Sequence, residues 1–437
     1  MILSSLALPR VLAVAGGLYF AAIMVLVVSK APLGSPIFYG TAAVAALAYG
    51  AVVARIWHEP VGSRRLLYIA FAMAVAFRVP PAVAPVGVDS DMVRYLWDGR
   101  VQQLGYNPYT VRPDNPALAH THRNQSAAMP SRHDGTPYPP AAQLFFRFVV
   151  SLHDSTLAMK LALVVCDLLT MLVLWRWLHF TGRSEWLTLT YAWNPLVVLE
   201  VAHSGHIDAL GALWTVAAAF WLARRRTQLA TLAFVLAVTT KLMPIVLVPL
   251  FLGRVRRRDV ALGAACLVAL YLPFGAADGT ALGAVPNVVD RVRFNSPIFS
   301  TLSAIAFPRF AAGVALVLAL TAATWARLRL AHDDPAAWAW PMAIAIACAP
   351  VIYPWYVLYL TPFLFTTATL PLAAWTISIL PVYEVWRRSR LGYRWITPVW
   401  VMAVEFGVVA ASALALFGRR SPAPAEQASV TDRTPIG

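Results

Sequence analysis

The sequence has little charge, few cysteines and very few lysines. Only 13% of its 437 residues are charged, whereas about a quarter are charged in a typical soluble domain. With a mean hydropathy of +0.65, such a chain belongs in a lipid bilayer. Cys166, Cys266 and Cys348 all lie inside apolar runs. They therefore build neither a disulfide framework nor a CxxC site, and each is expected to be a small buried hydrophobe.

Positive charge is plentiful, but it is dispersed. The net charge is +15, and 32 of the 35 basic residues are arginines. They occur in short clusters between apolar runs, at 55–65, 223–228 and 253–259, without a continuous basic face or a recognisable nucleic-acid-reading module. This pattern is a membrane-topology signal and argues against nucleic acid as a partner.

Apolar runs long enough to cross a bilayer recur along the whole chain. About 17–25 apolar residues are needed to cross ~30 Å of hydrocarbon. The sequence therefore predicts an all-α, polytopic transmembrane helical bundle of about 12–14 helices. The expected spans are 11–29, 37–56, 66–86, 156–179, 187–202, 207–223, 228–253, 259–275, 309–330, 336–352, 355–369, 371–386 and 397–417.

The arginine clusters predict the topology. The cluster at 54–65 belongs in the cytoplasm, which places residues 87–155 on the extracytoplasmic face as a large loop. Residues 228–253 have arginine clusters at both ends, so we expect a broken hairpin that turns near 239–244. Non-helical backbone at such a depth must be buried in protein or line a wet cavity.

The C-terminal part raises a conflict with this topology. The segment WRRSRLGYR (386–394) lies outside by the same count, despite its arginines. Either the last three helices are miscounted or these arginines attract a phosphate. Residues 1–417 are thus expected to form one membrane domain in the plasma membrane. Residues 418–437 are polar and without periodicity, and are expected to form a disordered cytoplasmic tail.

The stretch DSDMVRYLWDGRVQQLGYNPY (89–109) gathers acids, arginines and aromatic rings in the external loop. Four of its residues are three or four positions apart, so a short helix would present them on one face. These four are Asp91, Arg94, Tyr95 and Asp98. Asp89 would lie just before that helix, where a carboxylate can also serve simply as a cap.

This stretch resembles the first-loop signature of membrane-embedded GT-C glycosyltransferases, in the branch of polyprenyl-phosphate-mannose-dependent mannosyltransferases. Further matches follow in order along the chain: TPYPP (136–140), HSGHID (203–208), KLMP (241–244) and YPWY (353–356). The chain departs from the simplest family layout because two helices precede the one before the loop. That departure leaves the helix numbering open.

The resemblance implies an enzyme that transfers a hexose, by analogy mannose, from a polyprenyl-phosphate donor to a hydroxyl of a glycan or glycolipid. The transfer would be inverting, on the extracytoplasmic side, by a monomer. A hydroxyl is a poor nucleophile, so a carboxylate must take its proton. Asp89 is the first choice for this catalytic base and Asp91 the second. The same two carboxylates could instead hold Mg²⁺ or Mn²⁺; no other cofactor is expected.

A lipid-linked-sugar flippase or a proton-coupled transporter is the competing class. A carrier of that kind would place its ionisable groups near the bilayer midplane, on broken helices. It would have no reason to gather carboxylates in one large external loop.

The leaving phosphate requires a cation where its charge develops. Lys241 is the first candidate, because a lone cation in an apolar hairpin is costly without a partner. It could instead extend its stem to the membrane interface. Arg291 and Arg293 are further candidates for donor-phosphate binding, although they could equally pair with Asp290.

Further residues are expected to contact the substrates. HSGHID could bind sugar hydroxyls or cap a helix, and zinc is disfavoured because Gly205 argues for a turn. Glu200 lies one turn before His203 and could orient it. The YPWY rings could stack on a sugar or be interfacial anchors. The substrate-binding candidates are Arg94, Tyr95, Asp98, Asn107, Tyr138, His203, His206, Asp208, Tyr353, Trp355 and Tyr356.

Overall fold

The computed structural model describes residues 7–58, 62–85, 91–123, 129, 131–275 and 282–418. These residues form an all-α helical bundle, with one isolated β-bridge between Phe294 and Val351 and no strand. Seven of their helices are long and apolar enough to cross a membrane. They are α1 (Leu8–Val28), α2 (Pro36–His58), α3 (Arg64–Val83), α6 (Thr156–Phe180), α14 (Pro308–Arg329), the continuous stretch Thr367–Arg390, and α18 (Val399–Phe417). The predicted polytopic bundle is therefore confirmed.

Shorter helices complete the bundle. Four of them are apolar: α5 (Pro140–Leu152), α9 (Asp208–Ala223), α10 (Thr227–Thr240) and α15 (Pro335–Ala347). Outside the broken spans and the loop after α3, the others are α11 (Arg257–Tyr271), η7 (Leu272–Phe274), α12 (Val285–Arg291) and α13 (Pro297–Ile305). Within Thr367–Arg390 the elements are η10 (Thr367–Thr369), α16 (Leu370–Ser378), η11 (Leu380–Tyr383) and α17 (Glu384–Arg390).

Three of the expected spans are interrupted, and one of them, 228–253, was expected to be a broken hairpin. Residues 187–202 become η4 (Glu185–Thr188), α7 (Leu189–Ala192), α8 (Pro195–Val197) and η5 (Val198–His203), the last a π-helix. Residues 228–253 become α10 and η6 (Met243–Phe251), and residues 355–369 become η8 (Pro354–Tyr359), η9 (Thr361–Phe363) and η10. A proline stands in the first turn of α8, η6, η8 and η9. Because proline lacks an N–H and clashes with the preceding turn, each of these segments starts afresh.

The expected hairpin over 228–253 is confirmed. Helix α10 ends at Thr240, and Lys241 is extended. The rings of Phe234 on α10 and Phe251 at the end of η6 lie 4.5 Å apart between centroids, so the chain has doubled back. Both arginine clusters consequently lie at the same end of the bundle.

The loop after α3 is built from α4 (Asp91–Gln103), η2 (Pro116–Thr121) and α5. The predicted short helix over Asp91 to Asp98 is therefore present. Helices α4 and α5 pack closely at Gly99, where a Cβ atom would lie 2.7 Å from the carbonyl oxygen of Phe146. The ion pair between Arg100 and Asp154, with 2.8 Å between Nε and Oδ2, fixes the far side of the loop.

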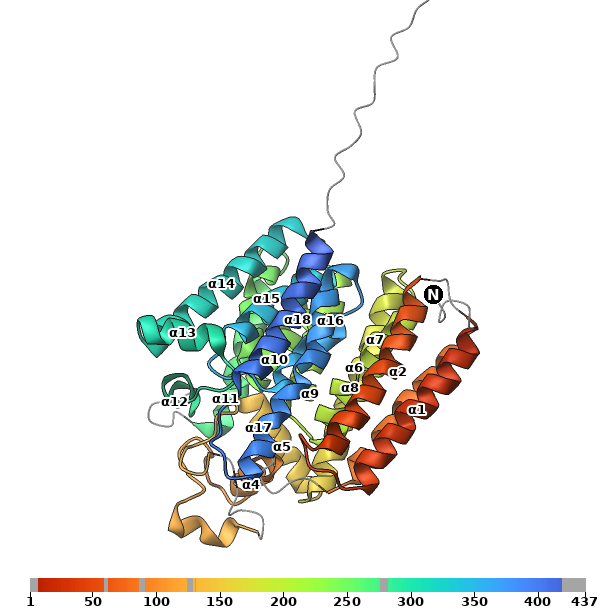
Figure 1. The fold of residues 1–437 in the computed structure, drawn as a ribbon. Coiled ribbons are helices and arrows are strands. Elements are labelled where there is room, and N and C mark those ends of the chain that lie inside the picture. Colours follow the sequence, from red (N-terminus) through yellow and green to blue (C-terminus); the bar gives the residue numbers. More distant parts are fainter. Residues whose placement is uncertain are drawn as a thin grey trace, which may run out of the picture.

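The two ends of the bundle differ. The start of α1 and the end of α18 lie at one end, and α4, α5 and α17 lie at the other (Figure 1). Arginines 254 and 327 lie at the first end, where Arg327 Nε donates to the carbonyl oxygen of Leu252 at 3.0 Å. Apart from Gly418, the predicted tail at 418–437 lies outside the described residues.

Candidate functional site

A polar cavity of about 370 Å³ opens at the α4 end of the bundle. It lies between the end of α1, the end of α3, the start of α4, the segment after η5, the start of η8, and α17. The polar and aromatic residues of its wall are Lys30, Asp91, His203, Ser204, His206, Trp355, Tyr383, Trp386 and Arg390. Asp91, His203, His206 and Trp355 are thus four predicted site residues that the fold brings together.

Asp91 is the first residue of α4, and its carboxylate lines the cavity. Its Oδ2 lies 3.8 Å from Nδ1 of His206, and its side chain is 23% exposed. A carboxylate in this place is close to protein partners and remains accessible from the cavity. Asp89, the first choice for a base, lies outside the described residues.

His206 lies between two carboxylates. Its Nε2 is 3.4 Å from Oε2 of Glu200, opposite the contact of its Nδ1 with Asp91. Burial and the nearby Lys241 ammonium lower the pKa of His206 well below its usual value, so the imidazole is neutral at pH 7. Glu200 was expected to orient His203, but His206 is the histidine that it contacts, because the chain turns between the two.

The local backbone explains this arrangement. The π-helix η5 adds a residue to the turn, and the N–H of His206 bonds to the carbonyl oxygen of Glu200 at 2.9 Å. Gly205 has φ +77°, and a Cβ atom there would lie 2.0 Å from Cε of Met92. Only glycine adopts that conformation against α4 without strain. The turn expected at Gly205 is confirmed.

Aromatic rings form one wall of the cavity. His206 stacks on Trp355 with 3.8 Å between centroids and 10° between planes, and Trp355 stacks on Tyr353 at 4.4 Å and 13°. Trp386 meets Trp355 edge-on at 6.2 Å. Trp355 is stacked between ring partners and is almost fully buried. The rings that line the cavity, Trp355, Tyr383 and Trp386, give it an apolar surface beside polar groups. Such a surface suits the apolar face of a sugar.

Lys241 lies beside this wall in an ion pair. Its Nζ is 2.6 Å from Oδ1 of Asp208 and 3.7 Å from the ring centroid of Tyr356. The pairing follows from the break after α10, which directs Lys241 toward the first turn of α9. Lys241 therefore has a protein partner, and its role as a phosphate ligand stays a prediction.

Arg291 and Arg293 lie at the end of α12 and just after it, and neither lines the cavity. Arg293 packs over the ring of Phe299 at 4.7 Å and donates to backbone carbonyls. Asp290, with which they could have paired instead, forms its ion pair with Arg309 at 3.0 Å. A phosphate role for both arginines remains untested.

Arg94 and Asp98 are buried within the loop. Arg94 Nε donates to Asp98 Oδ1 at 2.7 Å, and Asp98 Oδ2 accepts from Thr136 at 2.7 Å and from Gln143 at 2.8 Å. This network connects α4 to the TPYPP segment and to α5. The network gives both side chains partners within the protein. Their contact with a substrate stays a prediction.

Tyr95, Tyr138 and Asn107 also connect the loop to the bundle. The hydroxyl of Tyr95 accepts from the N–H of Ile207 at 3.4 Å, and its ring meets that of Tyr138 edge-on at 5.1 Å. Burial, with Asp91 nearby, raises the pKa of both phenols, which therefore stay protonated. Asn107 Nδ2 donates to the carbonyl oxygen of Phe274 at 2.6 Å.

Several residues of the cavity were not predicted. Lys30 and Arg390 supply cations, Trp386 supplies a ring, and the hydroxyl of Tyr383 donates to Glu200. A signal existed for two of them: Lys30 is one of only three lysines, and Arg390 belongs to the cluster whose side of the membrane was in conflict. Nothing in the sequence alone joins them to Asp91.

The predicted metal site would need several ligand side chains close together. No group of three or more His, Cys, Asp or Glu side chains placed to hold a metal ion occurs in the part of the chain that the structure describes. Of the predicted Asp89–Asp91 pair, Asp89 lies outside that part.

The fold is that of a multi-pass membrane protein with a cavity at one end of its helical bundle. Residues 4–256 match the sequence model of the alpha-(1->6)-mannopyranosyltransferase N-terminal domain, which is more than half of the chain. The chain belongs to this family of mannosyltransferases, and it is a glycosyltransferase. No curated protein and no solved structure matches it. The family gives no support to the alternative of a flippase or transporter.

Proposed function

We propose that the protein transfers mannose from a polyprenyl-phosphate donor to a hydroxyl of a glycan or glycolipid acceptor at the extracytoplasmic face. The observation that carries the proposal is the placement of Asp91 and His206 in one cavity with two cations. Glycosyl transfer from a phosphate needs a base for the acceptor hydroxyl and positive charge for the leaving phosphate, and a carboxylate and cations supply these here.

In the proposed reaction the acceptor oxygen attacks the anomeric carbon while its proton passes to Asp91 or Asp89. The bond between that carbon and the phosphate oxygen breaks, and its electron pair leaves with the lipid phosphate. His206, neutral and held by Glu200 and Trp355, positions the Asp91 carboxylate. One displacement inverts the anomeric carbon, so the alpha linkage in the family's name requires a donor of beta configuration.

The distribution of charge supports the orientation. The arginine clusters of the hairpin over 228–253 lie at the end opposite the cavity, as do Arg254 and Arg327. By the positive-inside bias, that end is cytoplasmic. The cavity then faces outward, where donors with a lipid monophosphate can reach it laterally.

The test is transfer by the purified full-length protein in detergent. Beta-configured polyprenyl-phosphate mannose should give a mannosylated product, and the alpha anomer and a nucleotide-linked mannose should not. Transfer from the nucleotide sugar alone would refute the donor class. Equal use of both anomers would refute single displacement.

A further inference from the structure

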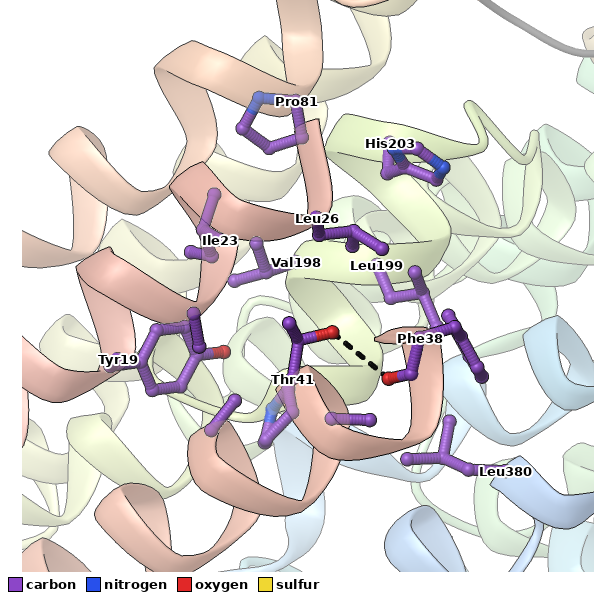
Figure 2. A pocket seen from close by; sticks show the side chains of 14 residues that line it. Tyr19, Ile23, Leu26, Phe38, Thr41, Pro81, Val198, Leu199, His203 and Leu380 are labelled. Carbon is purple, nitrogen blue, oxygen red and sulfur yellow. Dashed lines mark hydrogen bonds between the residues drawn. The ribbon is translucent and has the colours of Figure 1, made fainter. Parts of the chain in front are cut away.

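A narrow apolar cleft of about 50 Å³ adjoins the polar cavity. Figure 2 shows it between α1, α2 and η5, with Tyr19, Ile23 and Leu26 on one side and Phe38 and Val198 on the others. Leu26 and His203 line both the cleft and the polar cavity. The cleft therefore continues from the cavity toward the bilayer interior, over about 10 Å along α1 between Tyr19 and Leu26.

Two cations line the polar cavity that adjoins this cleft. Lys30 lies two residues after the end of α1, in a left-handed conformation with φ +49°. Arg390 ends α17, and its Nη2 donates to the carbonyl oxygen of Leu33 at 2.6 Å. Both side chains are exposed, and across the described residues neither has a carboxylate within ion-pair distance. By contrast, Arg387 on the same helix pairs with Glu384 at 2.6 Å.

The position of these cations calls for an explanation. They lie at the α4 end, away from the arginine clusters that set the topology, so the positive-inside bias does not account for them. An exposed cation beside a cavity, with no carboxylate paired to it among the described residues, is suited to an anionic ligand. The apolar continuation of the same cavity indicates a ligand that carries a hydrocarbon chain next to its anion.

We propose that Lys30 and Arg390 bind the phosphate of the lipid-linked donor and that the cleft between α1, α2 and η5 receives the first part of its prenyl chain. The inference rests on the proposed function and deepens it. The sugar then extends from the phosphate toward Asp91 and His206, which line the same cavity. As the glycosidic bond breaks, both cations stabilise the negative charge that develops on the phosphate.

The phosphate site is tested by steady-state kinetics with polyprenyl-phosphate mannose. Lys30→Gln and Arg390→Gln should each raise the donor KM roughly tenfold to hundredfold, as expected for a lost bond to a charged group. Lys30→Arg should stay near the wild-type KM. Arg388→Gln is the matched control, because Arg388 packs over Tyr393 at 4.9 Å and does not line the cavity. An unchanged donor KM in both glutamine variants would overturn the assignment.

The prenyl site is tested by chain length. Wild-type protein should prefer a donor with a long prenyl chain over one with a single isoprene unit. Ala42→Trp, in the cleft, should abolish that preference, and Leu47→Trp, at a position on α2 that is 75% exposed, should keep it. An intact preference in Ala42→Trp overturns the prenyl assignment.

A binding measurement separates a misfolded variant from a failed proposal. Polyprenyl phosphate without sugar should raise the melting temperature of the wild type more than phosphatidylglycerol does, and Lys30→Gln should lose that difference. Equal shifts from both lipids would mean that the cleft takes any anionic lipid, against the inference. If the wild type transfers mannose from the lipid donor and the variants have unchanged donor KM, only the assignment of these residues is rejected. If the wild type uses only a nucleotide sugar, the proposed function is rejected as well.

Discussion

Lys241 and Asp208 form an ion pair with 2.6 Å between Nζ and Oδ1, although 33 residues separate them in the chain. Asp208 is almost fully buried, and Lys241 is 20% exposed beneath the ring of Tyr356. The pair closes the break after α10 onto the start of α9. Lys241, the lone lysine of the apolar hairpin, is thus paired with the aspartate that ends the HSGHID motif.

The first prediction concerns this pair. Lys241→Met should lower the free energy of unfolding by about 3 kcal/mol, because it leaves a buried carboxylate unpaired. Adding Asp208→Asn should restore part of that loss. Denaturation of Lys241→Met, of Asp208→Asn and of the double variant in detergent measures the coupling. If the double variant is as unstable as the sum of the two single ones, the pair does not stabilise the fold.

The second prediction separates the two candidate bases. Asp91→Asn should lower kcat by about 10²–10⁴-fold, since a general base contributes that much. If Asp89 is the base instead, Asp89→Asn shows the larger loss. Asp114→Asn is the control, because Asp114 lies on the outer part of the loop and pairs with His133 at 2.9 Å. If both Asp89→Asn and Asp91→Asn keep full turnover, the catalytic base does not lie in residues 89–109.

The third prediction uses the pKa of His206. Burial and Lys241 lower that pKa well below 6.5. The imidazole therefore stays neutral as pH falls from 8 to about 6. Protonation of His206 should cause no fall in wild-type activity over this pH range. His206→Gln should lower kcat about tenfold and leave the acid limb of the pH profile unchanged. Disappearance of a limb near pH 6.5 in that variant would show that His206 titrates in the active range.

Much of the fold was predictable because the bilayer imposes it. Runs such as 11–29 and 156–179 had to be helices of the observed length, since hydrocarbon leaves no other way to satisfy the backbone. The broken spans were not predictable from hydropathy, which does not distinguish a 3₁₀ turn at Pro354 from an α-helix. The hairpin over 228–253 was found from its flanking arginines.

The part of the candidate site that lies within one short segment was predictable from residue spacing. The part formed by segments distant in the sequence was not. The spacing of Asp91, Arg94 and Asp98 predicted the helix, but only the fold shows that Arg94 and Asp98 turn inward while Asp91 faces the cavity. Lys30 and Arg390 are 360 positions apart. Their approach depends on Gly34, with φ +78° and no space for a Cβ against the carbonyl oxygen of Tyr383.

The last prediction concerns Gly205, which sets the direction of His206. Gly205→Ala adds a Cβ atom at φ +77°, 2.0 Å from Cε of Met92. Gly182→Ala is the matched control: Gly182 has φ +67°, and nothing lies within 4 Å of the added Cβ. Both variants should lose about 1 kcal/mol of stability through backbone strain. Only Gly205→Ala should also lose most of its kcat, because the clash with α4 shifts His206 from Asp91. If the two variants lose stability and kcat equally, the close contact between Gly205 and α4 has no part in positioning the cavity.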